Sequence, residues 1–390
     1  MNESTPLVQA DLTSPNHTNY RQTKDIEQNE YYEYESTPHN KCFVILYSIC
    51  GALITAGAFY FLGFYLPNMF LPVAQALEPL RKVAALDVQL HPYLATPHGT
   101  SRLVLIGDIH GQFNELQKLL KQMAYSRKRD TVVLLGDFIS KGPDSFKMLD
   151  WAEQNNIKCI LGNHELNILD IYTHYHRLDP LVFEASDANS ISLPVNLPPG
   201  MSVMRLDEDP EFLLARRLEP RHVKYLNSCP IILKLGPVAF RPSKSSPYDT
   251  DPTLFSGSVQ GVAVHGGLNP SIVSLEEQDP WDVVSVRDLV PPFFNETSEL
   301  PLEDGVSWTS KWKELQQTLS REKQMVVYYG HDAHRGLRLK SWSKGLDLGC
   351  NKGKQLSALT VWAEEGKKKK GGKHQKREVV YKDKLYQVEC

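Results

Sequence analysis

Residues 102–111 read RLVLIGDIHG, and this stretch decides the fold class. The apolar run 102–106 has the length and the branched side chains of a buried β-strand. The sequence Gly-Asp-Ile-His-Gly then places polar side chains between glycines, where the strand runs into a turn. A strand end is rigid, so a carboxylate and an imidazole held there are well placed for chemistry.

Four further apolar runs end in glycine and polar residues: 132–137 (VVLLGD), 157–165 (IKCILGNHE), 261–267 (GVAVHGG) and 325–332 (MVVYYGHD). The five strand ends together supply six candidate metal ligands: Asp108, His110, Asp137, Asn163, His265 and His331. This set is too large for one open tetrahedral site and suits two divalent ions that share a carboxylate. Mixed oxygen and nitrogen ligands without cysteine favour zinc, manganese or iron over a calcium site with oxygen ligands alone.

Helical stretches lie between the strands, at 112–123, 144–154 and 307–319. Additional strands are expected at 231–235, 356–362, 379–381 and 385–388. The alternation of strand and helix predicts an α/β fold, with ligands bound in the loops after the strands. The Pro-, Ser- and Asp-rich stretches 187–201 and 241–258 are predicted to be surface loops.

The N-terminal part has a different composition. The apolar run 42–66 contains no charged residue and, at about 1.5 Å per residue, can cross a hydrocarbon core of about 30 Å. We therefore predict a disordered tail at 1–41, a transmembrane helix at 42–66, a linker or edge-covering segment at 67–100 and one domain at 101–390. The flanking charges do not decide the orientation. Glycosylation sequons at Asn16 and Asn295 lie on opposite sides of the helix, so at most one can be lumenal.

Charge and cysteine content exclude several classes of protein. The 390 residues include 43 Lys+Arg and 46 Asp+Glu, a balance that argues against a nucleic-acid binder. Six cysteines without a CxxC pair exclude a disulfide scaffold and make a thiolate zinc site improbable. Cys159 is expected to be a free thiol in a buried strand. Cys229, Cys350 and Cys390 could form disulfides in an oxidising compartment.

These motifs resemble those of the calcineurin-like metallophosphoesterases, and more narrowly the diadenosine-tetraphosphatase-like branch of the phosphoprotein-phosphatase superfamily. Residues 345–350 (GLDLGC) are similar to the closing motif of that superfamily. The resemblance implies a β-sandwich flanked by helices. It also implies that His164 is the general acid and that Asp137 bridges two ions. One ion would be held by Asp108, His110 and Asp137, and the other by Asp137, Asn163, His265 and His331.

With its N-terminal helix, the whole chain is similar to the vacuolar zinc-dependent endopolyphosphatases of fungi. That resemblance implies cleavage of internal bonds in inorganic polyphosphate, at the vacuole membrane, by a lumenal domain. Lys141 and Arg335 are candidate substrate-binding residues. A polyanion would also need a basic track, for which further cations are available: Lys311, Lys313, Arg338 and the run 367–370.

Two positions depart from the superfamily pattern. Lys141 stands where many members have arginine, and a lysine lacks the bidentate fork that grips a phosphate monoester. Ser140 stands where protein phosphatases carry an aspartate that orients the catalytic histidine. Three alternative functions remain open: a dinucleoside polyphosphate hydrolase, a protein serine/threonine phosphatase, and a metal-free binding module. The sequence does not indicate an oligomeric state.

Overall fold

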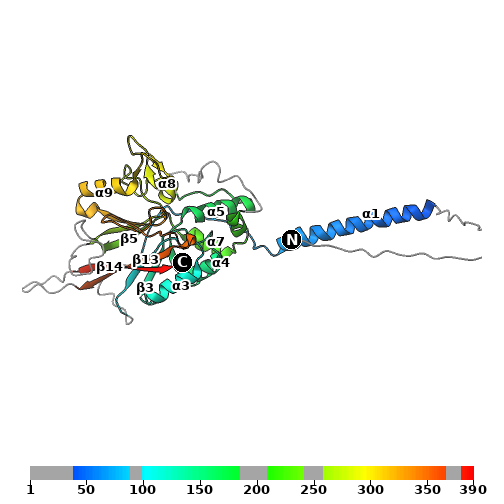
Figure 1. Cartoon of the computed structure of the whole chain (residues 1–390), viewed down its shortest axis with the longest axis horizontal. Coiled ribbons are helices and arrows are strands. Elements are labelled where there is room, and N and C mark those ends of the chain that lie inside the picture. The colour runs from blue at the N-terminus through cyan, green and yellow to red at the C-terminus, as the bar shows by residue number, and fades with distance from the viewer. Residues whose placement is uncertain (1–37, 88–98, 185–208, 241–257, 366–378) are drawn as a thin grey trace, which may run out of the picture. The chain divides into compact units, whose positions relative to one another are not determined.

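The computed structural model describes residues 38–87, 99–184, 209–240, 258–365 and 379–390 (Figure 1). The chain divides into two compact units, residues 1–69 and 70–390. Several predicted features lie outside the described residues: the tail up to residue 37, the sequon at Asn16, the loops 187–201 and 241–257, and the run 367–370.

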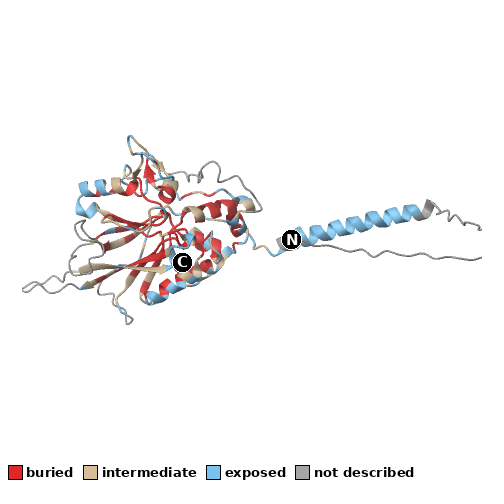
Figure 2. Cartoon of the chain, in the orientation of Figure 1, coloured by how far each residue is buried: buried red, intermediate tan, exposed pale blue. Residues whose placement is uncertain are grey.

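The described part of the first unit is a continuous apolar helix. It consists of α1 (Pro38–Tyr60), a π-helical turn η1 (Phe61–Tyr65) and α2 (Leu66–Met69). The stretch Lys41–Tyr65 is long and apolar enough to cross a membrane, and none of it is buried. The exposed colouring of the helix in Figure 2 shows the same feature. A soluble core helix would bury at least one face, so this finding fits a single membrane-spanning helix.

One sheet of the second unit has five strands in the order β14-β13-β2-β3-β4. Their bounds are β14 (Val379–Glu389), β13 (Gln355–Glu365), β2 (Arg102–Ile106), β3 (Asp130–Leu134) and β4 (Lys158–Cys159). β2, β3 and β4 run parallel, while β13 pairs antiparallel with both β2 and β14. The predicted strand at 102–106 is confirmed, and the two short strands expected near the C-terminus are one long strand, β14.

The second sheet has six strands in the order β1-β5-β6-β10-β12-β11. Their bounds are β1 (Val83–Ala85), β5 (Ile232–Ala239), β6 (Ser258–Ala263), β10 (Met325–Tyr329), β12 (Ser343–Gly345) and β11 (Arg338–Leu339). β6 and β10 are parallel neighbours. A small third sheet contains β8 (Thr297–Ser298), β7 (Asp288–Leu289) and β9 (Val306–Ser307).

The two large sheets pack against each other through β5, β13 and β14. Helix α3 (Phe113–Gln122) contacts β13 and β14 and carries Leu116, Leu119 and Leu120 on its buried face. The remaining helices are α4 (Ser145–Gln154), α5 (Asn163–His176), α6 (Pro210–Ala215), α7 (Pro220–Ser228), α8 (Pro280–Ser285) and α9 (Trp308–Thr318). Buried residues concentrate in the strands and on the inner helix faces (Figure 2). The predicted fold class, a β-sandwich flanked by helices, is confirmed.

Residues 70–87 belong to this sandwich. β1 pairs in parallel with β5, and Leu80 is fully buried. Gln75 N–H donates to the Tyr172 hydroxyl at 2.7 Å, and Glu78 exchanges two hydrogen bonds with Asn227. Residues 83–85 thus cover the edge of β5, which agrees with the second of the two roles predicted for 67–100, an edge-covering segment.

Two disulfides join elements that are distant in sequence: Cys159–Cys229 and Cys350–Cys390. The prediction of a free thiol at Cys159 is wrong. Leu161 N–H donates to Pro230 O at 3.0 Å, which brings the end of β4 beside the end of α7 and so aligns the two sulfurs. Cys42 and Cys50, in the apolar helix, are free.

Candidate metal centre

The strand ends of both sheets deliver polar side chains to one place. β2 and β3 are parallel neighbours in one sheet, as are β6 and β10 in the other. Parallel neighbours end at the same edge of a sheet, so Asp108 comes beside Asp137 and His265 comes beside His331. Asn163, which follows the short strand β4, is the first residue of α5.

Asp137 lies at the middle of the cluster. Its Oδ1 is 3.3 Å from His265 Nε2, and its Oδ2 is 3.6 Å from His110 Nε2 and 3.7 Å from His164 Nε2. Two groups of side chains have ligand atoms close enough to hold an ion, and both contain Asp137. The first is His110, Asp137 and His164, with His164 where the prediction has Asp108. The second is Asp137, His265 and His331.

The other two predicted ligands lie at the same cluster. Asp108 Oδ2 is 4.0 Å from His110 Nε2, and both carboxylate oxygens of Asp108 accept the His331 backbone N–H, at 3.0 and 3.1 Å. Asn163 Oδ1 lies 3.1 Å from His265 Nε2. The structure therefore brings all six predicted ligand residues together.

Each histidine among the candidate ligands has one ring nitrogen within hydrogen-bonding distance of a backbone carbonyl oxygen. His265 Nδ1 lies 2.7 Å from Leu135 O, and His110 Nδ1 lies 3.3 Å from Ile139 O. His331 uses the other nitrogen, Nε2, which lies 2.9 Å from Ser285 O. A ring N–H that donates to a carbonyl fixes the tautomer and leaves the opposite nitrogen as a lone-pair donor, as metal-binding histidines require.

The backbone around the cluster is unusual in two ways. His110, Asp137 and His331 have positive φ angles of 48°, 48° and 64°, a region that non-glycine residues seldom adopt. Such angles concentrate at functional sites, where surrounding structure holds them in place. In addition, a Cβ on Gly162 would collide with Asp137 Oδ1, and one on Gly330 would collide with Asp108 Oδ1. Glycine at these positions allows the carboxylates to approach.

The electrostatics of the cluster suit a cation. Burial, then repulsion from Asp347 and Asp137, raises the pKa of Asp108 well above its usual range. Burial would also raise the pKa of Asp137, but His265 and His164 hold it well below the usual range. Burial lowers the pKa of His110 to about 4, so this ring is neutral at pH 7. Buried carboxylates that repel each other beside the neutral ring of His110 form a donor set that fits divalent metal ions.

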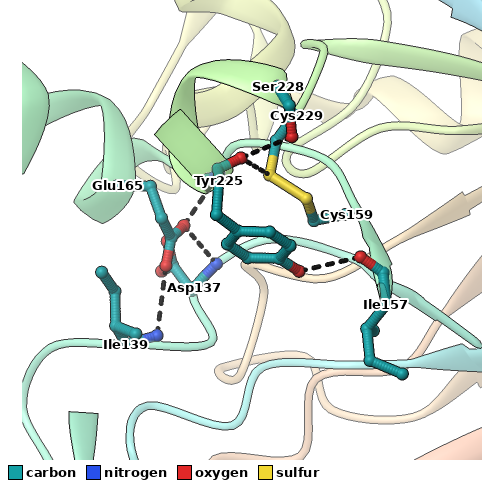
Figure 3. The surroundings of a disulfide bond; sticks show 9 residues. Asp137, Ile139, Ile157, Cys159, Glu165, Tyr225, Ser228 and Cys229 are labelled. Atoms are coloured by element: carbon teal, nitrogen blue, oxygen red, sulfur yellow. Dashed lines mark hydrogen bonds between the residues drawn. A yellow bond between two sulfur atoms is a disulfide. The ribbon is translucent and has the colours of Figure 1, made fainter. Parts of the chain in front are cut away.

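Glu165 supports the loops that carry the ligands (Figure 3). Its carboxylate accepts three backbone N–H groups: Asp137 at 2.7 Å, Gly162 at 2.9 Å and Ile139 at 3.1 Å. Burial and then Asp137 raise the pKa of Glu165 to about 7. Figure 3 also shows Tyr225, whose hydroxyl donates to Ile157 O at 3.0 Å, beside the Cys159–Cys229 disulfide. The disulfide and α7 thus lie near Glu165, the residue that supports the ligand-bearing loops.

His164, the predicted general acid, has a partner that the sequence reasoning missed. Its Nδ1 contacts the Glu211 carboxylate, and its Nε2 points towards Asp137. Burial opposes protonation of the ring, but Asp137 and Glu211 outweigh it and raise the pKa of His164. One signal for such a partner was present in the sequence. Ser140 replaces the aspartate that orients the catalytic histidine in protein phosphatases, so His164 needs a carboxylate from elsewhere in the chain.

The two candidate substrate-binding residues differ in their surroundings. Lys141 Nζ lies 3.4 Å from His110 Nε2, at the cluster itself. Arg335 instead forms two ion pairs, from Nη2 to Asp288 at 2.6 Å and from Nη1 to Asp332 at 2.9 Å. Its guanidinium is therefore already occupied by carboxylates.

Comparison with known proteins places the chain in a class. The two-sheet fold and the Asp/His/Asn cluster are those of a metal-dependent phosphoesterase, and the calcineurin-like phosphoesterase family matches residues 101–335. The chain belongs to the calcineurin-like phosphoesterase family, and it is a hydrolase.

Two kinds of curated relative are similar to the chain. A zinc-dependent endopolyphosphatase of Saccharomyces cerevisiae is 27% identical over 337 residues, covering 83% of this chain and 88% of the relative. A symmetrical bis(5'-nucleosyl)-tetraphosphatase of Erwinia tasmaniensis is 26% identical over 268 residues, covering 65% of this chain and 92% of the relative. The corresponding enzyme of Edwardsiella ictaluri is 37% identical over 114 residues, covering 27% of this chain and 39% of the relative.

Proposed function

We propose that this chain is a membrane-anchored endopolyphosphatase that hydrolyses internal phosphoanhydride bonds of inorganic polyphosphate with two divalent ions, zinc being the first candidate. The observation that carries the proposal is the position of Asp137, which belongs to both groups of candidate ligands. One carboxylate shared by two ligand groups is the arrangement that a two-ion phosphohydrolase needs. The similarity to a zinc-dependent endopolyphosphatase over most of the chain supports both the metal and the substrate.

Six residues would hold the ions. Asp108, His110 and Asp137 would hold one, and Asp137, Asn163, His265 and His331 would hold the other. When bound, the ions would neutralise charge on the phosphate and supply an activated water. Lys141, beside His110, would neutralise further charge on the non-bridging oxygens.

Hydrolysis adds one water across a P–O–P bridge. The water oxygen bonds to one phosphorus and releases one of its protons to solvent, and the bridging oxygen leaves with the other phosphorus. His164 would give the proton from Nε2 to this departing oxygen. A departing phosphate chain is a weak base, so this proton matters less than it would for an alkyl ester.

A group of cations near His331 supports a long polyanion as substrate. We call Lys313, Arg335, Arg338 and Lys340 the cation patch. Burial, then Arg338, Arg335 and Lys313, lowers the pKa of Lys340, which means that these like charges lie close together. Lys340 Nζ donates to Thr309 Oγ1 at 2.8 Å, and among the described residues neither Lys313 nor Arg338 has an ion-pair partner. Arg335 is paired with Asp288 and Asp332, so the attraction of the patch for a polyanion would come from Lys313, Arg338 and Lys340.

The disulfides support the orientation of the catalytic domain. Disulfides persist in oxidising compartments and are rare in the cytosol. Both lie in the unit 70–390, so this unit would face a lumen, with the vacuole as the proposed organelle. The exposed Asn295, and not Asn16, would then be open to glycosylation.

A substrate panel tests the function. The full chain, purified in detergent and supplied with zinc, manganese, cobalt or magnesium, would be incubated with long-chain polyphosphate, diadenosine tetraphosphate and a phosphopeptide. Cleavage in the middle of long chains supports the proposal. Release of terminal phosphate alone would contradict the endo mode.

The cation patch and the orientation have separate tests. Replacing Lys313, Arg338 and Lys340 by glutamine should raise KM for long polyphosphate and weaken its salt dependence, while the exposed control Lys147→Gln should not. For the orientation, an Asn295→Gln variant should remove any glycosidase-sensitive mass. A glycan at Asn16 would contradict a lumenal catalytic domain.

The second candidate function is hydrolysis of dinucleoside polyphosphates. The relative from Erwinia tasmaniensis favours it, because the match covers nearly the whole of that enzyme. Both substrates contain phosphoanhydride bonds, and the same panel separates them by comparing kcat/KM. A higher value for diadenosine tetraphosphate than for polyphosphate would replace the first proposal by the second.

A further inference from the structure

Glu211 lies at the meeting point of three elements. Its Oε1 contacts His164 Nδ1 and accepts a hydrogen bond from Ser140 Oγ at 2.8 Å. Its Oε2 accepts a hydrogen bond from Asn167 Nδ2 at 2.5 Å. His164 and Asn167 come from the first turns of α5, Ser140 from the loop after β3, and Glu211 from α6. Both carboxylate oxygens are therefore engaged by residues from separate parts of the chain.

Local structure holds Glu211 in this position. Asp209 caps α6, and its carboxylate accepts the Glu211 backbone N–H at 2.9 Å. Pro210 fixes the first helical residue, and Glu211 is buried in the first turn. Ser140 has a φ of 71°, and its backbone N–H donates to Ser145 Oγ at 3.0 Å. A carboxylate fixed from both its backbone and its oxygens has little freedom to move.

We propose that Glu211 is the positioning residue for His164. An imidazole whose Nδ1–H donates to a fixed carboxylate keeps one ring orientation and one tautomer, with Nε2 directed at the reaction. Ser140 supplies a hydroxyl that orients Glu211, and Asn167 orients the other oxygen. The role rests on the proposed function, in which His164 Nε2 gives a proton to the departing oxygen.

The kinetic test uses the full chain loaded with zinc and whichever substrate of the panel it cleaves. Glu211→Gln keeps the size of the side chain and should lower kcat by about 10- to 100-fold, the scale for losing an orienting partner, with KM within about twofold. Glu211→Asp keeps the carboxylate and should recover part of the loss in kcat. The matched control is Glu219→Gln, an exposed carboxylate at the start of the neighbouring helix α7.

A double-mutant cycle separates positioning from a general structural role. If Glu211 acts through His164, Glu211→Gln should change kcat by less than about twofold when His164 is already alanine. Equal fold-losses in the two backgrounds would overturn the proposal. So would loss of bound zinc in Glu211→Gln, because that result would assign the residue to the stability of the metal centre.

A spectroscopic readout keeps the test independent of substrate. A His164 Nδ1–H bonded to a carboxylate should give a low-field proton resonance in zinc-loaded, ¹⁵N-histidine-labelled full chain. The resonance should vanish in His164→Ala, shift to higher field in Glu211→Gln and stay unchanged in Glu219→Gln. Its absence from the unsubstituted protein would overturn the positioning role. Failure to cleave any substrate in the panel would instead contradict the proposed function.

Discussion

Asp137 Oδ1 lies 3.3 Å from His265 Nε2, although the two residues follow strands of different sheets. The contact joins the segment after β3 to the segment after β6. The other ring nitrogen of His265 lies 2.7 Å from Leu135 O, near the end of β3, so the imidazole is held to that segment at both of its nitrogens. The candidate metal centre therefore depends on the relative position of the two sheets.

Asp137→Asn tests whether the shared carboxylate holds both ions. The substitution preserves shape but removes the negative charge, so zinc bound per chain should fall. Turnover should fall by at least about 100-fold, the scale for losing one charge-stabilising group in an active site. Metal analysis and steady-state kinetics measure the two effects. Asp304→Asn, at an exposed aspartate, is the control and should match the unsubstituted protein. Full metal content with normal turnover would contradict a shared ligand.

His164→Ala should cost less than Asp137→Asn when polyphosphate is the substrate. A departing phosphate chain needs little help from an acid, so the loss should be about 10- to 100-fold, at or below the lower end of the range for general acid catalysis. The two variants would be compared in one assay of chain shortening. Equal residual activities would show that the proton donor is as important as the metal ligand.

Cys390→Ser tests the disulfide that ties β14 to the short 3₁₀ helix η5 (Cys350–Lys352). Because the bond closes a loop with a sequence separation of 40, its loss should lower the free energy of unfolding by about 2–4 kcal/mol. Thermal unfolding of the full chain measures the change. Cys42→Ser, at a free cysteine, is the matched control. If a reducing agent left the melting temperature of the unsubstituted protein unchanged, the disulfide would not contribute.

Asp130→Asn should make stability less dependent on pH. Burial would raise the pKa of Asp130, but hydrogen bonds from Arg102, at 2.8 and 2.7 Å, and from Arg129 lower it. A lowered folded-state pKa adds stability above the unfolded value of about 3.9, and that stability is lost as the pH falls through the folded value. The substitution should therefore cost about 1–3 kcal/mol at pH 7.

The difference in unfolding free energy between Asp130→Asn and the unsubstituted protein should narrow below about pH 4, where the carboxylate begins to protonate in the unfolded state. Chemical unfolding at several pH values measures it, with Asp304→Asn as the exposed control. If the difference in unfolding free energy stayed constant from pH 7 to pH 3, the ion pairs of Asp130 would not be its cause.

The sequence predicted the strand ends because each has the same local signature. An apolar run followed by glycine and a ligand residue marks Asp108, Asp137 and His331 without reference to distant parts of the chain. The positive φ angles of His110, Asp137 and His331 were not predictable, since they depend on how the loops pack around the cluster. Their roles as ligands stay predictions until a metal is measured.

Two features escaped the sequence because they depend on contacts between distant residues. Helix α5 begins at Asn163, inside the stretch 157–165, whose pattern predicts only a strand end. The apolar residues of α5 are buried on several faces rather than one. Glu211 was missed because the segment Asp209-Pro210-Glu211 indicates only a helix start. Nothing local shows that its carboxylate contacts His164.

Residues 70–87 pack against the sandwich, and this packing decides where the chain can be truncated for production. A version that starts at residue 101, where the family match begins, would lose β1 and expose the edge of β5 as a template for aggregation. It would also remove the partner of the Tyr172 hydroxyl and uncover the apolar neighbours of Leu80. A soluble version should retain the chain from Phe70 onward, so that truncation removes the apolar helix and leaves the sandwich whole.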